Sequence, residues 1–140
     1  MSRSGYSEDC DGRELIMWRG AVAAAIRGKR GQRALRELVV ALDAMPAKRL
    51  ITDALEIDGE YCALGLLAKA RGVDLLSIDE YAANSVAKAL DIAPAMAKEV
   101  MHLNDEYFNS YPWIEHYSPE RRWAAVRRWA EIELKKEEGV

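Results

Sequence analysis

The chain has 140 residues, of which 50% are hydrophobic, and its 20 basic and 23 acidic side chains give a formal net charge of −3. A chain of this length can bury about 70% of the surface that its unfolded form exposes, which is enough for one domain, residues 1–140. Its aliphatic and aromatic content excludes a disordered chain, and no apolar run approaches the roughly 18 residues of a membrane-spanning helix. The N-terminus is polar, and two cysteines make neither a disulfide framework nor a zinc site, so we expect a cytoplasmic protein without a membrane partner.

The small net charge hides an uneven distribution along the chain. Residues 1–49 carry ten basic and six acidic groups, residues 50–120 carry four and thirteen, and residues 121–140 carry six and four. Basic groups are densest between Arg13 and Arg36, where Glu14 is the single acid. Such a division indicates either a binding surface or ordinary solvation of a soluble domain.

The N-terminal part predicts two helices. Apolar residues recur at three- and four-residue spacing over about residues 10–27, and a second stripe follows between residues 35 and 42. Arg27-Gly28-Lys29-Arg30-Gly31 separates them as a tight basic connection. The second helix must end near Met45, because Pro46 disfavours helical geometry at the residue before it. Two helices joined in this way predict an antiparallel helical hairpin.

The remaining segments predict one small β-hairpin and four further helices. Asp58-Gly59 is a hairpin-turn signal within residues 49–61. Helices are expected over residues 61–71, from a capping box at 77–80 through about residue 90, from Pro94 onward, and from Ser118-Pro119-Glu120 to the C-terminus. Residues 104–117 are expected to be an aromatic-rich loop. The predicted fold class is therefore mainly α: a single compact helical domain with an N-terminal helical hairpin and at most one small β-hairpin.

Two separated motifs carry a resemblance to a known group of proteins. The segment Gly59-Glu60-Tyr61-Cys62-Ala63-Leu64-Gly65 is followed about forty residues later by Leu103-Asn104-Asp105. Together with N-terminal segments such as Trp18-Arg19-Gly20-Ala21-Val22, they resemble small uncharacterised proteins of bacteriophages and prophages, over most of the chain to about Asp105. The resemblance implies a phage origin and a setting in the bacterial host cell, and it implies no catalytic residue.

Five basic residues around the predicted connection are the first candidate site: Arg27, Lys29, Arg30, Arg33 and Arg36. Two glycines among them can leave backbone N–H groups open just before a helix N-terminus, which favours anions. The alternative is a solvated loop. A second basic set on the last helix lies beside Trp123 and Trp129, where stacking on bases competes with simple packing of the tryptophans in the core.

The cysteine and histidine residues offer weaker chemistry. Cys62 lies where the hairpin passes into a helix, a location that can lower a thiol pKa, and His102 or His116 with Asn104 or Asp105 would have to complete a hydrolase site. A small buried hydrophobe is the alternative for Cys62. Two histidines without paired cysteines are a poor metal-ligand set. We therefore expect no catalytic site, no metal and no cofactor.

These observations predict a non-enzymatic phage or prophage interaction protein. Its basic residues would steer it to a host protein or protein–nucleic acid complex, and an aromatic cluster would anchor the contact: Tyr107, Phe108, Tyr111 and Trp113. One such role is inhibition of a bacterial defence complex, as anti-CRISPR proteins do. The alternatives are a nucleic-acid-binding regulator, although the sequence has no clear helix-turn-helix signature, and a cysteine-dependent hydrolase. Patches of opposite charge also permit a homodimer, or docking of the acidic middle on the chain's own basic part.

Overall fold

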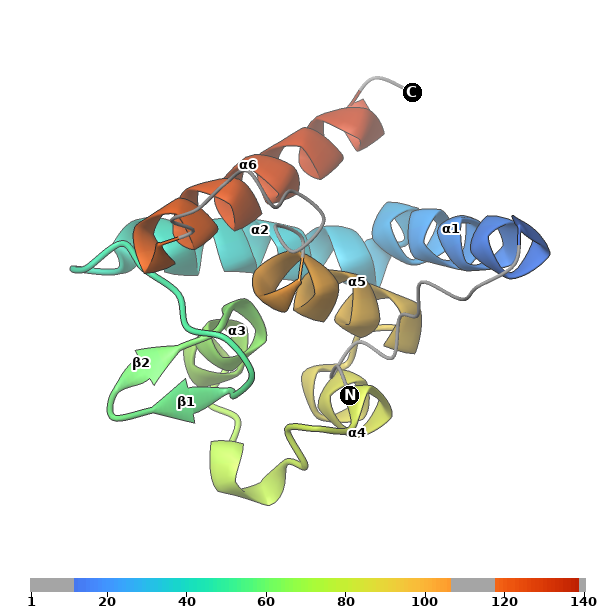
Figure 1. The fold of residues 1–140 in the computed structure, drawn as a ribbon. Helices are drawn as coiled ribbons and strands as arrows, with labels where there is room; N and C mark the ends of the chain where they lie inside the picture. Colours follow the sequence, from blue (N-terminus) through green and yellow to red (C-terminus); the bar gives the residue numbers. More distant parts are fainter. Residues whose placement is uncertain (1–11, 107–117, 139–140) are drawn as a thin grey trace.

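A computed structural model describes residues 12–106 and 118–138 (Figure 1). The elements in chain order are α1 (Gly12–Arg27), α2 (Lys29–Ala44), β1 (Glu56–Ile57), β2 (Glu60–Tyr61), α3 (Ala63–Ala70), the single 3₁₀ turn η1 (Leu75–Ser77), α4 (Ala83–Leu90), α5 (Pro94–Asp105) and α6 (Pro119–Glu138). The expected mainly α fold with one small β-hairpin is confirmed. Within the described ranges, no helix has both the length and the apolar character needed to cross a membrane.

The core is a single cluster of buried apolar side chains to which every helix from α1 to α6 contributes. α5 contacts α1, α3, α4 and α6, while α2 packs on α6 and α3. Leu35, Leu38 and Leu42 of α2 are at most 1% exposed. Their spacing places them on one face of the helix, so the opposite face of α2 is turned to solvent.

The α1–α2 connection is shorter than the sequence predicts. Gly28 alone separates the two helices, and Lys29, Arg30 and Gly31 form the first turn of α2 rather than a loop. A Cβ on Gly31 would lie 2.1 Å from the carbonyl oxygen of Ala25, so only glycine allows the helices to approach this closely. The two consecutive helices therefore meet at their adjoining ends (Figure 1).

The β-hairpin forms at the predicted turn. Glu56 pairs with Tyr61 and Ile57 with Glu60 in antiparallel register. Asp58 and Gly59 both have positive φ, 51° and 80°, as a two-residue type I′ turn requires. The next helix, α3, begins directly after Cys62, which caps it.

The predicted capping box at residues 77–80 is wrong. The Ser77 hydroxyl donates to the backbone carbonyl of Asp74, 2.7 Å away, inside η1. The Glu80 carboxylate instead accepts from the backbone N–H of Leu55 at 3.0 Å and so holds the segment before the hairpin. α4 begins later, at Ala83, with no side-chain cap. A tertiary hydrogen bond has replaced the local one that the motif predicts.

The ends of α5 and α6 agree in part with expectation. Pro94 occupies the first turn of α5, and the Ser118 hydroxyl accepts from the N–H of Arg121 at the start of α6. Asn104 and Asp105, which we expected in a loop, belong to the last turn of α5. The four aromatic residues predicted to anchor a partner, Tyr107, Phe108, Tyr111 and Trp113, lie outside the described residues.

Candidate partner-binding surface

All five predicted basic residues are exposed: Arg27, Lys29, Arg30, Arg33 and Arg36. On α2, Lys29, Arg33 and Arg36 follow one another at helical spacing and share the solvent face. The expected cradle of glycine N–H groups is not formed, because the Gly28 N–H donates to the carbonyl of Ala24 and Gly31 is buried against α1. The basic side chains therefore carry the positive character of this surface.

A polar cavity of about 280 Å³ lies beside the first half of α2. It is lined by Arg30, Arg33, Glu37, Arg71 and Asp91. Arg30 pairs with Asp91 at 3.0 Å, and the guanidinium of Arg71 donates to the carboxylate of Glu37, with its Nε at 2.9 Å. Both carboxylates of the cavity are thus already neutralised, whereas three arginines line it.

A second cavity, of about 430 Å³, continues along α2 toward its C-terminus. It shares Glu37 and Arg71 with the polar cavity, and it adds Arg36 and a largely apolar wall that includes Val40 and Ala44. Val40 is 69% exposed, although it is a large apolar side chain on an ordered helix. An exposed apolar side chain between basic ones is typical of a contact surface.

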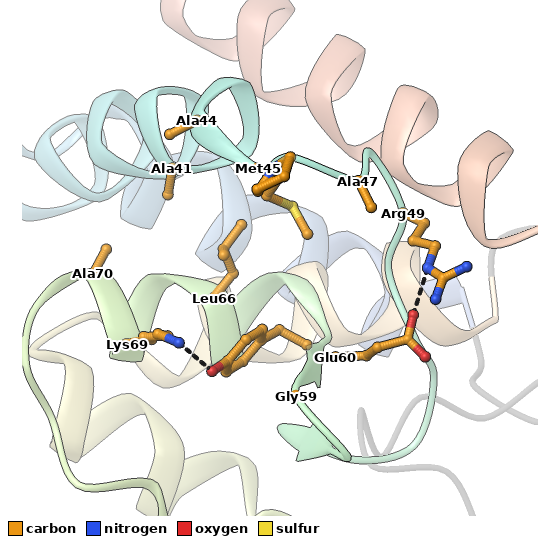
Figure 2. Close-up of a pocket in the computed structure, with 12 residues that line it drawn as sticks. Ala41, Ala44, Met45, Ala47, Arg49, Gly59, Glu60, Leu66, Lys69 and Ala70 are labelled. Atoms are coloured by element: carbon orange, nitrogen blue, oxygen red, sulfur yellow. Dashed lines mark hydrogen bonds and ion pairs between the residues drawn. The ribbon is translucent and has the colours of Figure 1, made fainter.

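The third cavity, about 630 Å³, lies between the end of α2, α3 and the β-hairpin (Figure 2). In Figure 2, Met45 from the end of α2 and Leu66 from α3 point toward each other, and Arg49 pairs with Glu60. The Lys69 ammonium donates to the Tyr61 hydroxyl at 2.6 Å and lies 4.8 Å from the ring centroid. The hydrogen bond to Tyr61 raises the pKa of Lys69, which favours its cationic form.

The three cavities form one surface, which we call the α2 trough. The second and third share Ala41, Ala44 and Ala70, as the first and second share Glu37 and Arg71. Basic side chains outnumber acidic ones along it: Arg30, Arg33, Arg36, Arg49, Lys69 and Arg71 against Glu37, Glu60 and Asp91. Because each of the three carboxylates is paired with an arginine, the trough keeps an excess of positive charge around an apolar centre.

The motif residues that suggested a cysteine nucleophile have a structural role. Cys62 is 1% exposed, and its Sγ accepts from the backbone N–H of Gly65 at 3.3 Å as the cap of α3. The Asn104 side chain accepts from the N–H of Ala63 at 3.1 Å and donates to the carbonyl of Ile51 at 2.8 Å. The two motifs therefore join α5 to the hairpin segment, and their burial withholds the thiol from a substrate. In the sequence, this contact of Asn104 with Ala63 and Ile51 was signalled only by the presence of both motifs, residues 59–65 and 103–105.

His102, which the hydrolase alternative required as a base, lies between two helices. His102 contacts Glu106, with its Nδ1 3.4 Å from the carboxylate, and meets the ring of Trp18 edge-on. Within residues 12–106 and 118–138, no three His, Cys, Asp or Glu side chains are grouped to hold a metal ion. The arrangement gives His102 a packing role between α1 and α5.

The last helix packs as the core alternative predicted. Trp123 is partly buried against the core, and its Nε1–H donates to the carbonyl of Leu42 at 3.1 Å. Arg127 pairs with Glu131 at 2.9 Å, and also with Asp43 of α2 at 2.8 Å. The hydrogen bond from Arg127 lowers the pKa of Asp43. These contacts tie α6 to α2 and hold the Trp123 indole against the C-terminal part of α2.

The acidic middle of the chain docks in part on the chain's own basic region. Arg19 pairs with Glu99, Arg30 with Asp91 and Arg49 with Glu60. These contacts join carboxylates of residues 50–120 to arginines of residues 1–49.

Comparisons with known protein families, with curated proteins and with solved structures found no match.

Proposed function

We propose that this chain is a non-enzymatic interaction protein that binds an acidic macromolecular partner through the α2 trough. The observation that carries the proposal is the excess of basic over acidic side chains along three adjoining cavities with an apolar centre. Exposed basic side chains steer an acidic partner and select it, while desolvated apolar contacts hold it. Catalysis is not part of the proposal, because the described residues that line the trough include no Ser, Thr, Cys or His side chain.

A protein partner suits this surface better than a nucleic acid. A phosphate backbone requires rows of basic groups and gains nothing from Val40, Ala44 and Leu66, whereas an acidic protein segment can use both kinds of contact. The overall net charge of −3 also opposes non-specific binding to nucleic acid.

The resemblance to phage and prophage proteins suggests where this partner is found. On this basis we infer that the partner is a host macromolecule in the bacterial cytoplasm, and inhibition of a host defence complex is one such role. The charge and apolar centre of the α2 trough thus suggest the chemistry of the partner, and the sequence resemblance suggests that the partner is found in the bacterial host cell.

The test compares partner capture by three forms of the tagged protein from nuclease-treated bacterial lysate. In the trough variant, Arg33→Glu with Arg36→Glu, we expect the captured protein to be lost. The matched control, Arg121→Glu with Arg128→Glu, makes the same charge change at exposed positions of α6 and should capture normally. Thermal unfolding of each form verifies folding. Equal capture by the two variants would remove the proposal.

A second candidate function follows from α4 and α5. They are separated by three residues with Asp91 in the left-handed conformation, φ 53°, and the facing Ala87, Ile92 and Ala97 are buried. Two packed helices joined by a three-residue turn are features of a helix-turn-helix, which the sequence alone had not indicated. Such a unit would make the chain a nucleic-acid-binding regulator.

The residues at the start of α5 weaken this second candidate. A recognition helix reads base edges with the side chains of its first turn, and Ala93, Pro94 and Ala95 offer no hydrogen-bonding group there. A mobility-shift titration with mixed-sequence duplex DNA distinguishes the two. Binding that falls steeply with salt supports the regulator, and no shift at low salt supports the protein-binding function.

A further inference from the structure

A second exposed surface has the opposite charge to the α2 trough. Residues 74–81, which we call the acidic projection, contain three acidic and no basic side chains. Leu76 is 96% exposed and Tyr81 is 67% exposed. In Figure 1 the single turn η1 is the yellow-green segment at the lower edge of the molecule. The projection thus presents apolar side chains among carboxylates.

Local hydrogen bonds fix the shape of the acidic projection. The Asp74 carboxylate accepts from the N–H of Leu76 at 3.0 Å, and the Asp79 carboxylate accepts from the N–H of Tyr81 at 3.1 Å. Leu76 is therefore held in the solvent by an ordered turn. An apolar side chain on a pre-organised backbone segment loses less conformational entropy on binding than one on a flexible segment.

The acidic projection and the α2 trough are neighbours on the surface. A hollow of about 660 Å³ lies beside the projection and is lined by Leu75, Leu76 and Glu80. It shares Tyr61 and Lys69 with the largest cavity of the trough. The two surfaces therefore adjoin on either side of the hydrogen-bonded Tyr61–Lys69 pair.

We propose that two copies of the chain form a two-fold symmetric dimer in which the acidic projection of each copy occupies the α2 trough of the other. The proposal rests on the proposed function in taking the trough as a binding surface, and it adds regulation: the dimer covers the trough until an acidic partner displaces the second copy.

Charge and apolar exposure are complementary between the two surfaces. Leu76 and Tyr81 of one copy would cover Val40 and the neighbouring alanines of the other, while Asp74 and Asp79 meet the excess of arginine. Because trough and projection adjoin, one two-fold axis beside Lys69 produces both contacts, as an isologous interface requires. Carboxylate–arginine contacts at the rim would make the dimer weaken as salt rises.

Sedimentation velocity of the full chain tests the dimer. The wild type should sediment as twice 15.7 kDa at low salt and shift toward the monomer at high salt. Leu76→Lys places a lysine of each projection against the basic trough of the other copy, and Arg33→Glu places a glutamate of each trough against the acidic projection. Because like charges then meet in both contacts of the dimer, each variant should be monomeric at protein concentrations about tenfold above the midpoint of the wild-type monomer–dimer equilibrium. Ile132→Lys, an exposed apolar position on α6, is the matched control and should dimerise normally.

Mixing the two monomeric variants gives the sharper result. A pair of Leu76→Lys and Arg33→Glu chains has one wild-type contact and one in which lysine meets glutamate, so the mixture should form the heterodimer that neither variant forms alone. A monomeric wild type, a mixture that stays monomeric, or a dimer lost only in Ile132→Lys would overturn the inference.

The two proposals fail separately. A monomeric wild type whose partner capture is lost on reversal of Arg33 and Arg36 would overturn the dimer and keep the proposed function. A dimer that shows the heterodimer rescue, with capture unaffected by those reversals, would keep the dimer and overturn the proposed function.

Discussion

The Asn104 side-chain oxygen accepts a hydrogen bond from the backbone N–H of Ala63, 3.1 Å away, and so joins the last turn of α5 to the first turn of α3. The amide nitrogen of Asn104 donates to the carbonyl of Ile51 at 2.8 Å and to the carboxylate of Asp105 at 2.7 Å. Asp105 in turn accepts from the N–H of Asp53 at 3.2 Å. One buried amide and its neighbour thereby hold the irregular segment before the β-hairpin.

We expect Asn104→Ala to destabilise the fold by about 2–4 kcal/mol, because Ala63 N–H and Ile51 C=O lose their partner in a site where Asn104 is 1% exposed. Urea unfolding followed by tryptophan fluorescence measures the change. Asn84→Ala, at an exposed position of α4, should change the free energy of unfolding by less than about 0.5 kcal/mol. Similar effects at the two positions would refute the role assigned to Asn104.

Replacing either of two helical glycines, Gly65 or Gly20, with alanine should change the free energy of unfolding, but in opposite directions. A Cβ on Gly65 would lie 1.9 Å from the carbonyl oxygen of Leu55, so Gly65→Ala should cost more than about 2 kcal/mol or prevent folding. A Cβ on Gly20 of α1 would meet nothing within 4 Å, so Gly20→Ala should stabilise the fold by about 0.5–1 kcal/mol. Thermal and urea unfolding of both variants measures the two signs. A tolerated Gly65→Ala would contradict the close approach of α3 to Leu55.

The pH dependence of stability should contain a contribution from Glu99. Burial raises the pKa of Glu99, while Arg19 and His102 oppose this shift. The folded state then binds the proton more tightly than the unfolded state, so the contribution of Glu99 falls as pH rises from its unfolded pKa of about 4.5 through the raised folded pKa.

Glu99→Gln isolates this contribution. The difference in unfolding free energy, wild type minus variant, should decrease as the pH is raised from below the unfolded pKa to neutrality. Urea titrations of both proteins at a series of pH values give this difference. A difference that increases over the same interval would show that the ion pair with Arg19 outweighs desolvation.

Cys62 should react slowly in the folded protein. Its thiol is 1% exposed and caps α3, so alkylation by iodoacetamide at neutral pH requires local or global opening. A Cys10→Ser background leaves Cys62 as the only cysteine, and mass spectrometry follows its modification with and without urea. Rapid alkylation without denaturant would revive the hydrolase alternative.

Much of the fold is encoded locally. The apolar spacing of α1 and α2, the stop before Pro46 and the Asp58-Gly59 turn each depend on residues a few positions apart, so the sequence predicts them well. The capping box at 77–80 fails because the Glu80 carboxylate accepts instead from a long-range partner, the N–H of Leu55. Local signals do not report such competition.

The α2 trough also has one part that the sequence predicts and another that depends on tertiary packing. Composition alone located the basic residues of α2, because they outnumber acids in their own segment. The opposite wall of the trough, Lys69, Ala70 and Arg71, comes from α3 and the residue after it, and no local pattern links it to Arg33 or Val40. Helical periodicity therefore determined which face of α2 meets solvent. Only the packing of α3 against α2 decided that this face borders a hollow. Long-range contacts of Gly65 with Leu55 and of Asn104 with Ala63 fix the position of α3.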